Sequence, residues 1–179
     1  MFHAGPVDGE AVELGFWTDE EKIFTTRSGL NRTSKELKEI YEVKMPENEA
    51  AIGRAAAMGD LSENSEWDAA MEEKRNLSER SARMEADVRR AALLENTSLP
   101  ENMICPGTVV RYKEIAARDV HTITILGPWD AEGREDVVSY RAPLAKGLLG
   151  LKVGDQRTVQ LPSGSIDVEV LEITPASID

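Results

Sequence analysis

The residues with the clearest chemical potential are four acidic side chains between positions 60 and 68. Asp60 and Glu63 are followed by Glu66 and Asp68, and the residues between them are small, polar or apolar but not basic. Paired carboxylates are hard oxygen ligands that suit Mg²⁺, including an ion shared with another macromolecule. A solvated acidic surface is the simpler interpretation of such a cluster. The spacing alone therefore leaves two possibilities, a metal-binding pair or an ordinary charged surface.

Other kinds of catalytic or structural site find little support in the sequence. Cys105 is the only cysteine, and His3 and His121 are the only histidines. These counts exclude disulfide frameworks, zinc fingers and Cys/His/Asp nucleophile triads. The sequence also lacks a Gly-rich phosphate loop and a Gly-x-Ser-x-Gly elbow. We therefore expect a protein that is not an enzyme by itself.

Charge and hydropathy narrow the range of partners. The chain of 179 residues carries 33 acidic and 21 basic side chains, a net charge of −12. Such a charge repels the phosphate backbone, so we expect no independent sequence-specific DNA binding. No apolar run approaches the ~20 residues needed to span a bilayer, and the acidic start does not resemble a signal peptide. The expectation is a cytoplasmic protein with no membrane partner.

The acidic residues lie where two predicted helices meet. From about residue 26 to 94 the chain is rich in Lys, Glu, Arg, Ala, Leu and Met, which predicts two long helices. Gly59 can end the first, and Asp60 or Ser62 can cap the second, so an antiparallel hairpin is the economical connection. Pro46 lacks an amide hydrogen and should kink the first helix near residues 41–45.

An apolar stripe at helical spacing predicts how the two helices pack. In the second helix, apolar residues recur in steps of three and four, as in a coiled-coil seam, with Lys74 and Ser81 at two imperfect positions. These seam residues are Trp67, Ala70, Leu77, Met84, Val88 and Ala91, and those expected to face them are Leu30, Leu37, Tyr41, Ile52 and Ala55. Core packing is the expected role of each.

The rest of the chain has a different period. Residues 1–25 are expected to be an extension without assigned function, with a short helix at 18–24 from a capping-box pattern. The hairpin at 26–95 and a linker at 96–106 follow it, and a C-terminal domain at 107–174 precedes a tail at 175–179. That domain alternates Val, Ile and Thr with polar residues over five stretches, which predicts a small antiparallel sheet. A short helix near 142–150 should cover one face.

The stretch GDLSENSEWDAA at residues 59–70 closely resembles the tip signature of bacterial Gre transcript-cleavage factors, of the GreA/GreB kind. Residues 26–37, 44–47 and 142–155 resemble further segments of that family, so the likeness covers most of the chain. The resemblance implies an α+β protein with an N-terminal antiparallel coiled-coil hairpin and a small FKBP-like antiparallel β domain with a short helix.

The resemblance also implies a function. Members insert the coiled coil into the secondary channel of RNA polymerase and stimulate cleavage of the nascent RNA 3′ end in backtracked complexes, which rescues arrested transcription. By motif position, Asp60 and Glu63 would be the catalytic acids, holding a Mg²⁺ shared with polymerase and not bound tightly by the isolated protein. Residues expected to support the tip are Gly59, Leu61, Ser62, Asn64, Glu66 and Trp67. Residues expected to dock on polymerase are Pro143, Leu144, Gly147 and Gly150.

Three other interpretations remain. A Gre-like protein could occupy the channel and inhibit polymerase without promoting cleavage. An FKBP-type prolyl isomerase with a coiled-coil arm would need an apolar pocket walled by aromatic residues, and the C-terminal half offers only Tyr112, Trp129 and Tyr140. A pure interaction module could use the hairpin to bind another coiled coil.

Overall fold

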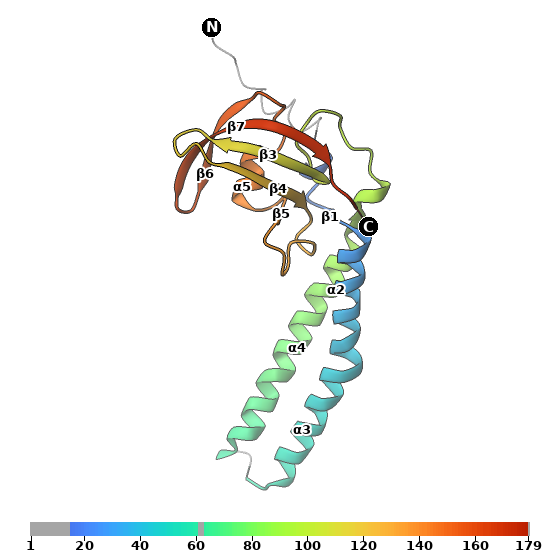
Figure 1. Ribbon diagram of the computed structural model, residues 1–179. Helices are drawn as coiled ribbons and strands as arrows, with labels where there is room; N and C mark the ends of the chain where they lie inside the picture. Colours follow the sequence, from blue (N-terminus) through green and yellow to red (C-terminus); the bar gives the residue numbers. More distant parts are fainter. Residues whose placement is uncertain (1–14, 61–62, 179) are drawn as a thin grey trace. The chain divides into compact units, whose positions relative to one another are not determined.

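The computed structural model describes residues 15–60 and 63–178, which form two compact units (Figure 1). One unit is the helical hairpin, Asn31–Arg90. The other joins the residues up to Leu30 with those from Ala91 onward. The hairpin is thus an insertion in the chain of the sheet-containing unit, and the residues directly before and after it, Leu30 and Ala91, belong to that unit. The α+β class and the N-terminal hairpin predicted from the sequence are confirmed.

The first arm of the hairpin is helical throughout but changes register. It consists of α2 (Arg27–Glu39), the π-helical turn η2 (Ile40–Lys44) and α3 (Met45–Ala57). Pro46 occupies the first turn of α3 and has no amide hydrogen, and the amide of Met45 donates to the carbonyl of Ile40, five residues back. The disturbance expected at residues 41–45 therefore takes the form of a π turn before the proline.

The second arm is α4 (Ser65–Arg89). The seam between the two arms contains both apolar and polar buried residues. Ile40, Ala55, Ala70 and Leu77 are buried, and so are Thr33, Asn48 and Ser81. The Nδ2 of Asn48 donates to the carbonyl of Ala70 across the seam at 2.9 Å. The expectation that Tyr41 lies in the seam is wrong, since Tyr41 is 43% exposed. The wider π turn places Ile40 there instead, and the Tyr41 hydroxyl donates to Glu85 on the outside.

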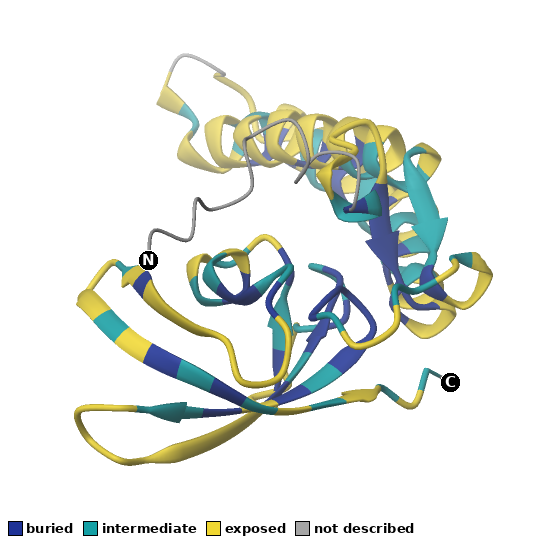
Figure 2. Ribbon diagram, turned by 90° about the horizontal axis from the view of Figure 1, so that it is seen from above, coloured by how far each residue is buried: buried dark blue, intermediate teal, exposed yellow. Residues whose placement is uncertain are grey.

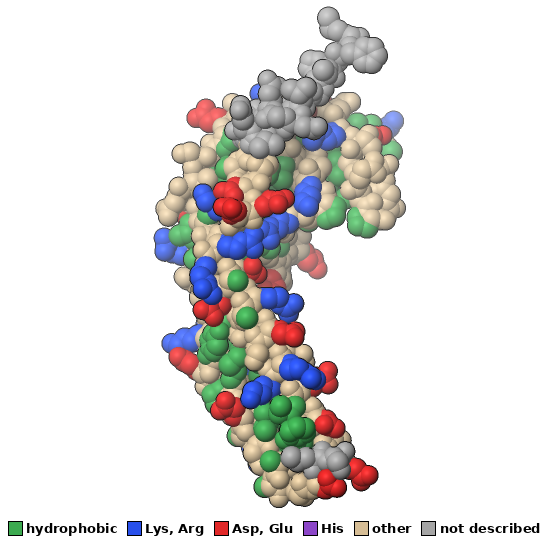
Figure 3. Space-filling model, turned by 180° about the vertical axis from the view of Figure 1, so that it is seen from behind, with side chains coloured by type: hydrophobic (Ala, Val, Ile, Leu, Met, Phe, Trp, Pro, Cys, Tyr) green, Lys and Arg blue, Asp and Glu red, His purple; other side chains and the backbone are tan. Residues whose placement is uncertain are grey.

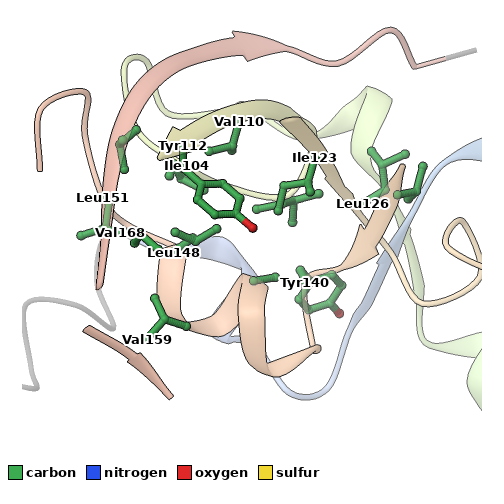
Figure 4. Close-up of a cluster of buried hydrophobic side chains, with 14 of the residues drawn as sticks. Ile104, Val110, Tyr112, Ile123, Leu126, Tyr140, Leu148, Leu151, Val159 and Val168 are labelled. Atoms are coloured by element: carbon green, nitrogen blue, oxygen red, sulfur yellow. The ribbon is translucent and has the colours of Figure 1, made fainter. Parts of the chain in front are cut away.

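The other unit contains a five-stranded sheet in the order β5-β4-β3-β7-β6. Its strands are β3 (Thr108–Glu114), β4 (Val120–Leu126), β5 (Val137–Ser139), β6 (Gln156–Leu161) and β7 (Gly164–Pro175). Buried residues alternate with more exposed ones along β3 (Figure 2), as the sequence pattern predicts. The helix α5 (Pro143–Leu148) packs on β6. Figure 4 shows the buried hydrophobic cluster, to which Leu148, Val159 and Val168 belong.

The sheet differs from the expected antiparallel arrangement at one edge. β5 runs parallel to β4, with Thr124 paired to Val137 and Leu126 to Ser139. Antiparallel neighbours need only a tight hairpin turn, whereas here the loop at 127–136 carries the chain back along β4 before β5 begins. The remaining neighbours in this sheet are antiparallel.

The segment before the hairpin is part of this unit's core. The helix predicted at 18–24 is wrong: the structure has a 3₁₀ turn, η1 (Phe16–Thr18), and then β1 (Ile23–Thr25). The Thr18 hydroxyl donates to the carbonyl of Gly15 instead of capping a helix. β1 pairs in parallel with β2 (Ala91–Leu93), directly after the hairpin, and Phe24 is buried.

The segment at 96–106 also packs against the core. It follows the 3₁₀ turn η4 (Leu94–Asn96), and Ile104 and Cys105 within it are fully buried. Ile104 donates its amide to Leu151 and accepts from the amide of Gly150, both at 2.8 Å. Burial raises the pKa of the Cys105 thiol to about 11.

In the described part of the chain, no helix is both long and apolar enough to cross a membrane.

Candidate functional site

The acidic residues singled out in the sequence lie at the tip of the hairpin, where the chain turns from α3 into α4. α3 stops at Ala57, and Gly59 has φ +109°, a conformation that favours glycine. Asp60 follows and is exposed. Leu61 and Ser62, two of the expected tip residues, lie outside the described residues.

Asn64 closes the turn between the helices. Its Oδ1 accepts a hydrogen bond from the amide of Trp67 at 3.1 Å, which caps the N-terminus of α4. Its Nδ2 donates to the carbonyl of Ala55 at 2.8 Å, in the last turn of α3. Asn64 is therefore the N-cap of α4, in place of the Asp60 or Ser62 expected from the sequence. One side chain both starts the second helix and ties it to the first.

The four carboxylates are all exposed around this turn. Glu66 and Asp68 lie in the first turn of α4, where negative charge interacts favourably with the helix dipole. Asp60 and Glu63 precede the helix. Figure 3 shows acidic side chains gathered at the end of the hairpin, with lysines and arginines interspersed farther along that face. Trp67 is half-buried.

The carboxylates at the tip form only part of a set of metal ligands. Among residues 15–60 and 63–178, no three His, Cys, Asp or Glu side chains come close enough together to hold a metal ion. Asp60 and Glu63 are two carboxylates, and Mg²⁺ prefers six oxygen ligands in octahedral geometry. These residues fit a Mg²⁺ ion whose remaining ligands come from a partner or from water.

The expected docking residues lie in and after α5. Pro143 begins the helix and is exposed, whereas Leu144 packs against the core. A side chain at Gly147 would overlap Val159, so this glycine allows α5 to pack closely on β6. Gly150 has φ +86° in the turn that follows. Three of these four residues thus have a clear structural role, and Pro143 is the most accessible.

Two of the three aromatic residues that a prolyl isomerase pocket would require, Tyr112 and Tyr140, lie in the core. Tyr112 and Tyr140 are each 5% exposed and belong to the buried cluster. Burial and the nearby charge of Glu114 raise the pKa of Tyr112. The Tyr140 hydroxyl accepts from the amide of Phe24 at 3.3 Å. These side chains fill the interior and do not wall an open binding pocket.

One buried carboxylate was not singled out from the sequence. Asp130, in the loop between β4 and β5, is 2% exposed and accepts hydrogen bonds from Thr25, Thr26 and Gly127. Thr25 and Thr26 lie more than 100 positions earlier, immediately before α2. The turn-forming Gly127-Pro128 pair marks the loop in the sequence, but nothing local indicates that Asp130 turns inward.

Comparison with known protein families agrees with this architecture. The protein-family model described as "Transcription elongation factor, N-terminal" matches residues 23–93. The family model described as "Transcription elongation factor, GreA/GreB, C-term" matches residues 99–175. The chain belongs to the GreA/GreB family of transcription elongation factors. Members of this family are accessory factors that work with RNA polymerase and are not enzymes themselves. The resemblance inferred from the tip motif is confirmed.

Individual GreA/GreB relatives match over almost their whole length. Transcription elongation factor GreA of Treponema pallidum (strain Nichols) is 35% identical over 156 residues, which are 87% of this chain and 96% of the relative. GreA of Shouchella clausii is 34% identical over 155 residues, 87% of this chain and 98% of the relative. Among solved structures, GreA factor homolog 1 of Thermus thermophilus is 24% identical, with a TM-score of 0.40 over 86% of this chain and 99% of its own.

Proposed function

We propose that this GreA/GreB-family protein inserts its hairpin into the secondary channel of RNA polymerase and stimulates cleavage of backtracked RNA at the 3′ end. The observation that carries the proposal is a pair of exposed carboxylates at the end of a long, narrow helical element. α4 alone has 25 residues, about 37 Å at 1.5 Å per residue. A support of that length can present side chains deep inside another macromolecule. Action on polymerase implies a cytoplasmic location.

Asp60 and Glu63 are the residues that would hold Mg²⁺ together with polymerase. In a two-metal site, the ions stabilise the attacking and leaving oxygens of an in-line displacement. The protein's own contribution is to bring two carboxylates to the reacting phosphate. The Asn64 cap and the positive φ of Gly59 shape the backbone on either side of this pair.

Docking is assigned to the sheet-containing unit, at the mouth of the channel. Pro143 is exposed at the start of α5, and Lys146 is exposed on the same short helix. Leu144, Gly147 and Gly150 support this surface from within by packing and by turn geometry. The proposal separates binding, through the α5 region, from chemistry, through the tip.

The test is RNA cleavage in stalled, backtracked elongation complexes with the full-length protein. Asp60→Asn and Glu63→Gln are expected to lower stimulated cleavage by about two orders of magnitude, because losing a metal ligand removes several kcal/mol of transition-state stabilisation. Asp68→Asn, at another exposed acid near the tip, is the matched control and should retain most cleavage.

Polymerase binding is measured in parallel by competition with the wild-type protein. The affinity of the Asp60 and Glu63 variants should stay within about threefold, since a group that acts only in the transition state leaves binding unchanged. Equal losses of affinity and cleavage would make the tip a docking surface. Tight binding by the wild type without any cleavage would establish the channel-binding inhibitor instead.

A further inference from the structure

We propose that Asp130 is a positioning residue, which anchors the start of the hairpin and thereby determines whether the tip carboxylates reach their site productively. The proposal rests on the function proposed above, because it concerns how Asp60 and Glu63 are delivered. It uses a buried group that neither metal binding nor docking involves. Every contact on which it depends lies within the unit that contains the sheet.

Asp130 is a carboxylate held by N–H and O–H donors. Its Oδ2 accepts from the Gly127 amide at 2.9 Å, the Thr26 amide at 3.1 Å and the Thr25 hydroxyl at 3.2 Å. Its Oδ1 accepts from the Thr26 hydroxyl at 2.6 Å. At 2% exposure, water cannot readily replace these bonds, so losing one leaves a buried donor unsatisfied.

Thr26 connects Asp130 to α2, the first helix of the hairpin. Its hydroxyl donates its single proton to Asp130 and accepts from the amide of Gly29 at 3.1 Å, as an N-cap does in the first turn of α2. The orientation of the hydroxyl that serves Asp130 leaves its lone pairs available to Gly29. Asp130 thus sets the geometry of the cap from which α2 begins.

Two glycines make room for this contact. A side chain at Gly29 would overlap the Asp130 carboxylate, and one at Gly127 would overlap the carbonyl of Phe24. The first turn of α2 and the loop after β4 therefore approach each other more closely than side chains would allow. Such an approach fixes the backbone as well as the side chains.

The end of the hairpin is joined to the same anchor. β1 ends one residue before Thr26, and β2 begins at Ala91, directly after α4 and its C-cap. β1 and β2 pair in parallel, so the chain entering the hairpin lies beside the chain leaving it. Glu95, just past β2, accepts from the amide of Arg27 at 2.8 Å. Both ends of the insertion meet at the segment that Asp130 binds.

Because the hairpin helices are long, a small change in their orientation at Asp130 becomes a large displacement of the tip. A tilt of about 5° at the start of a helix displaces its other end by about 3 Å over the roughly 37 Å of α4. Reactions between positioned groups lose about 100-fold in rate for a misplacement of about 1 Å. Weakening the anchor should therefore reduce cleavage at saturation more than it reduces binding.

The experiment measures cleavage in backtracked complexes as a function of the concentration of full-length factor. Thr26→Val and Asp130→Asn are expected to lower the rate at saturating factor at least tenfold, with the half-saturating concentration changed less than threefold. Thr26→Ser, which keeps the hydroxyl, should restore the rate to within twofold of wild type. Thr108→Val is the matched control, because it removes another buried hydroxyl bond, from Thr108 to the Cys105 carbonyl at 2.7 Å.

Amide hydrogen exchange in the free protein gives a readout without polymerase. In Asp130→Asn, protection of the Gly29 amide should fall about tenfold, although this amide bonds to Thr26 and not to Asp130. If Asp130→Asn does not fold, the Thr26→Val and Thr26→Ser pair decides the question. Unchanged saturating rates in folded Thr26→Val, or an equal loss in Thr108→Val, would overturn the proposal. Retained cleavage in Asp60→Asn would instead overturn the proposed function.

Discussion

Asn64 is the residue whose replacement should most directly loosen the tip. Asn64→Ala removes the N-cap bond to the Trp67 amide, a loss of about 0.5 to 2 kcal/mol. It also removes the bond from Nδ2 to the Ala55 carbonyl, a further loss of about 0.5 to 1.5 kcal/mol. Together these predict a local destabilisation of about 1 to 3.5 kcal/mol. Opening of the tip should then become about 5- to 400-fold more frequent.

Native-state hydrogen exchange measures this opening directly. The amides of Trp67 and Asp68, which bond to the Asn64 side chain and carbonyl, should lose protection by that factor, while core amides of the sheet keep theirs. Asn64→Ser retains a capping oxygen but cannot reach across to α3, so it should show an intermediate effect. Asn31→Ala, at an exposed position in α2, is the control. Wild-type protection of the Asp68 amide in Asn64→Ala would show that the cap does not hold the tip.

Further predictions concern the metal and the sheet-containing unit. Calorimetry of the free protein should detect no micromolar Mg²⁺ site, because two exposed carboxylates fall well short of six ligands. Gly147→Ala should lower the free energy of unfolding by about 1 to 3 kcal/mol, measured by urea denaturation, since its methyl group would overlap Val159. The Cys105 thiol should resist alkylation at pH 8 unless the protein unfolds, because its pKa of about 11 keeps it protonated. The unfolded thiol ionises at a lower pH, so stability should fall as pH rises above about 9 in thermal melts. A chain with a short Gly-Ser linker in place of residues 31–90 should fold and bind polymerase without promoting cleavage; failure to fold would show that the hairpin is needed for the sheet.

The parts of this structure that follow from the sequence are those with short-range signals. Helical composition and spacing predict the hairpin, and Ala70 and Leu77 are buried in the seam as expected. Alternation predicts the strands, and Pro143 marks the start of the short helix. Asp60 and Glu63 stand out because their position next to Gly59 places them at a helix break. Each of these inferences needs only residues a few positions apart.

The parts that do not follow depend on distant residues. β1 has three residues, and its partner β2 lies beyond the whole hairpin, so no local pattern reveals the pairing. The capping box at residues 18–21 is a valid local signal, but burial of Phe24 and strand pairing outweigh it. The inward orientation of Asp130 likewise depends on donors at Thr25 and Thr26. Non-local burial decides these cases, and propensity carries little information about it.

The distant contacts matter because the hairpin is an insertion. An element at the end of a chain is held at one point, whereas one inserted into a unit is held at both ends. Here the strands β1 and β2 bring those ends together, and Asp130 binds the segment between β1 and α2. The residues that present the carboxylates and the residues that hold the hairpin are therefore at opposite ends of the same two helices. A sequence motif identifies the first group, and only the folded structure identifies the second.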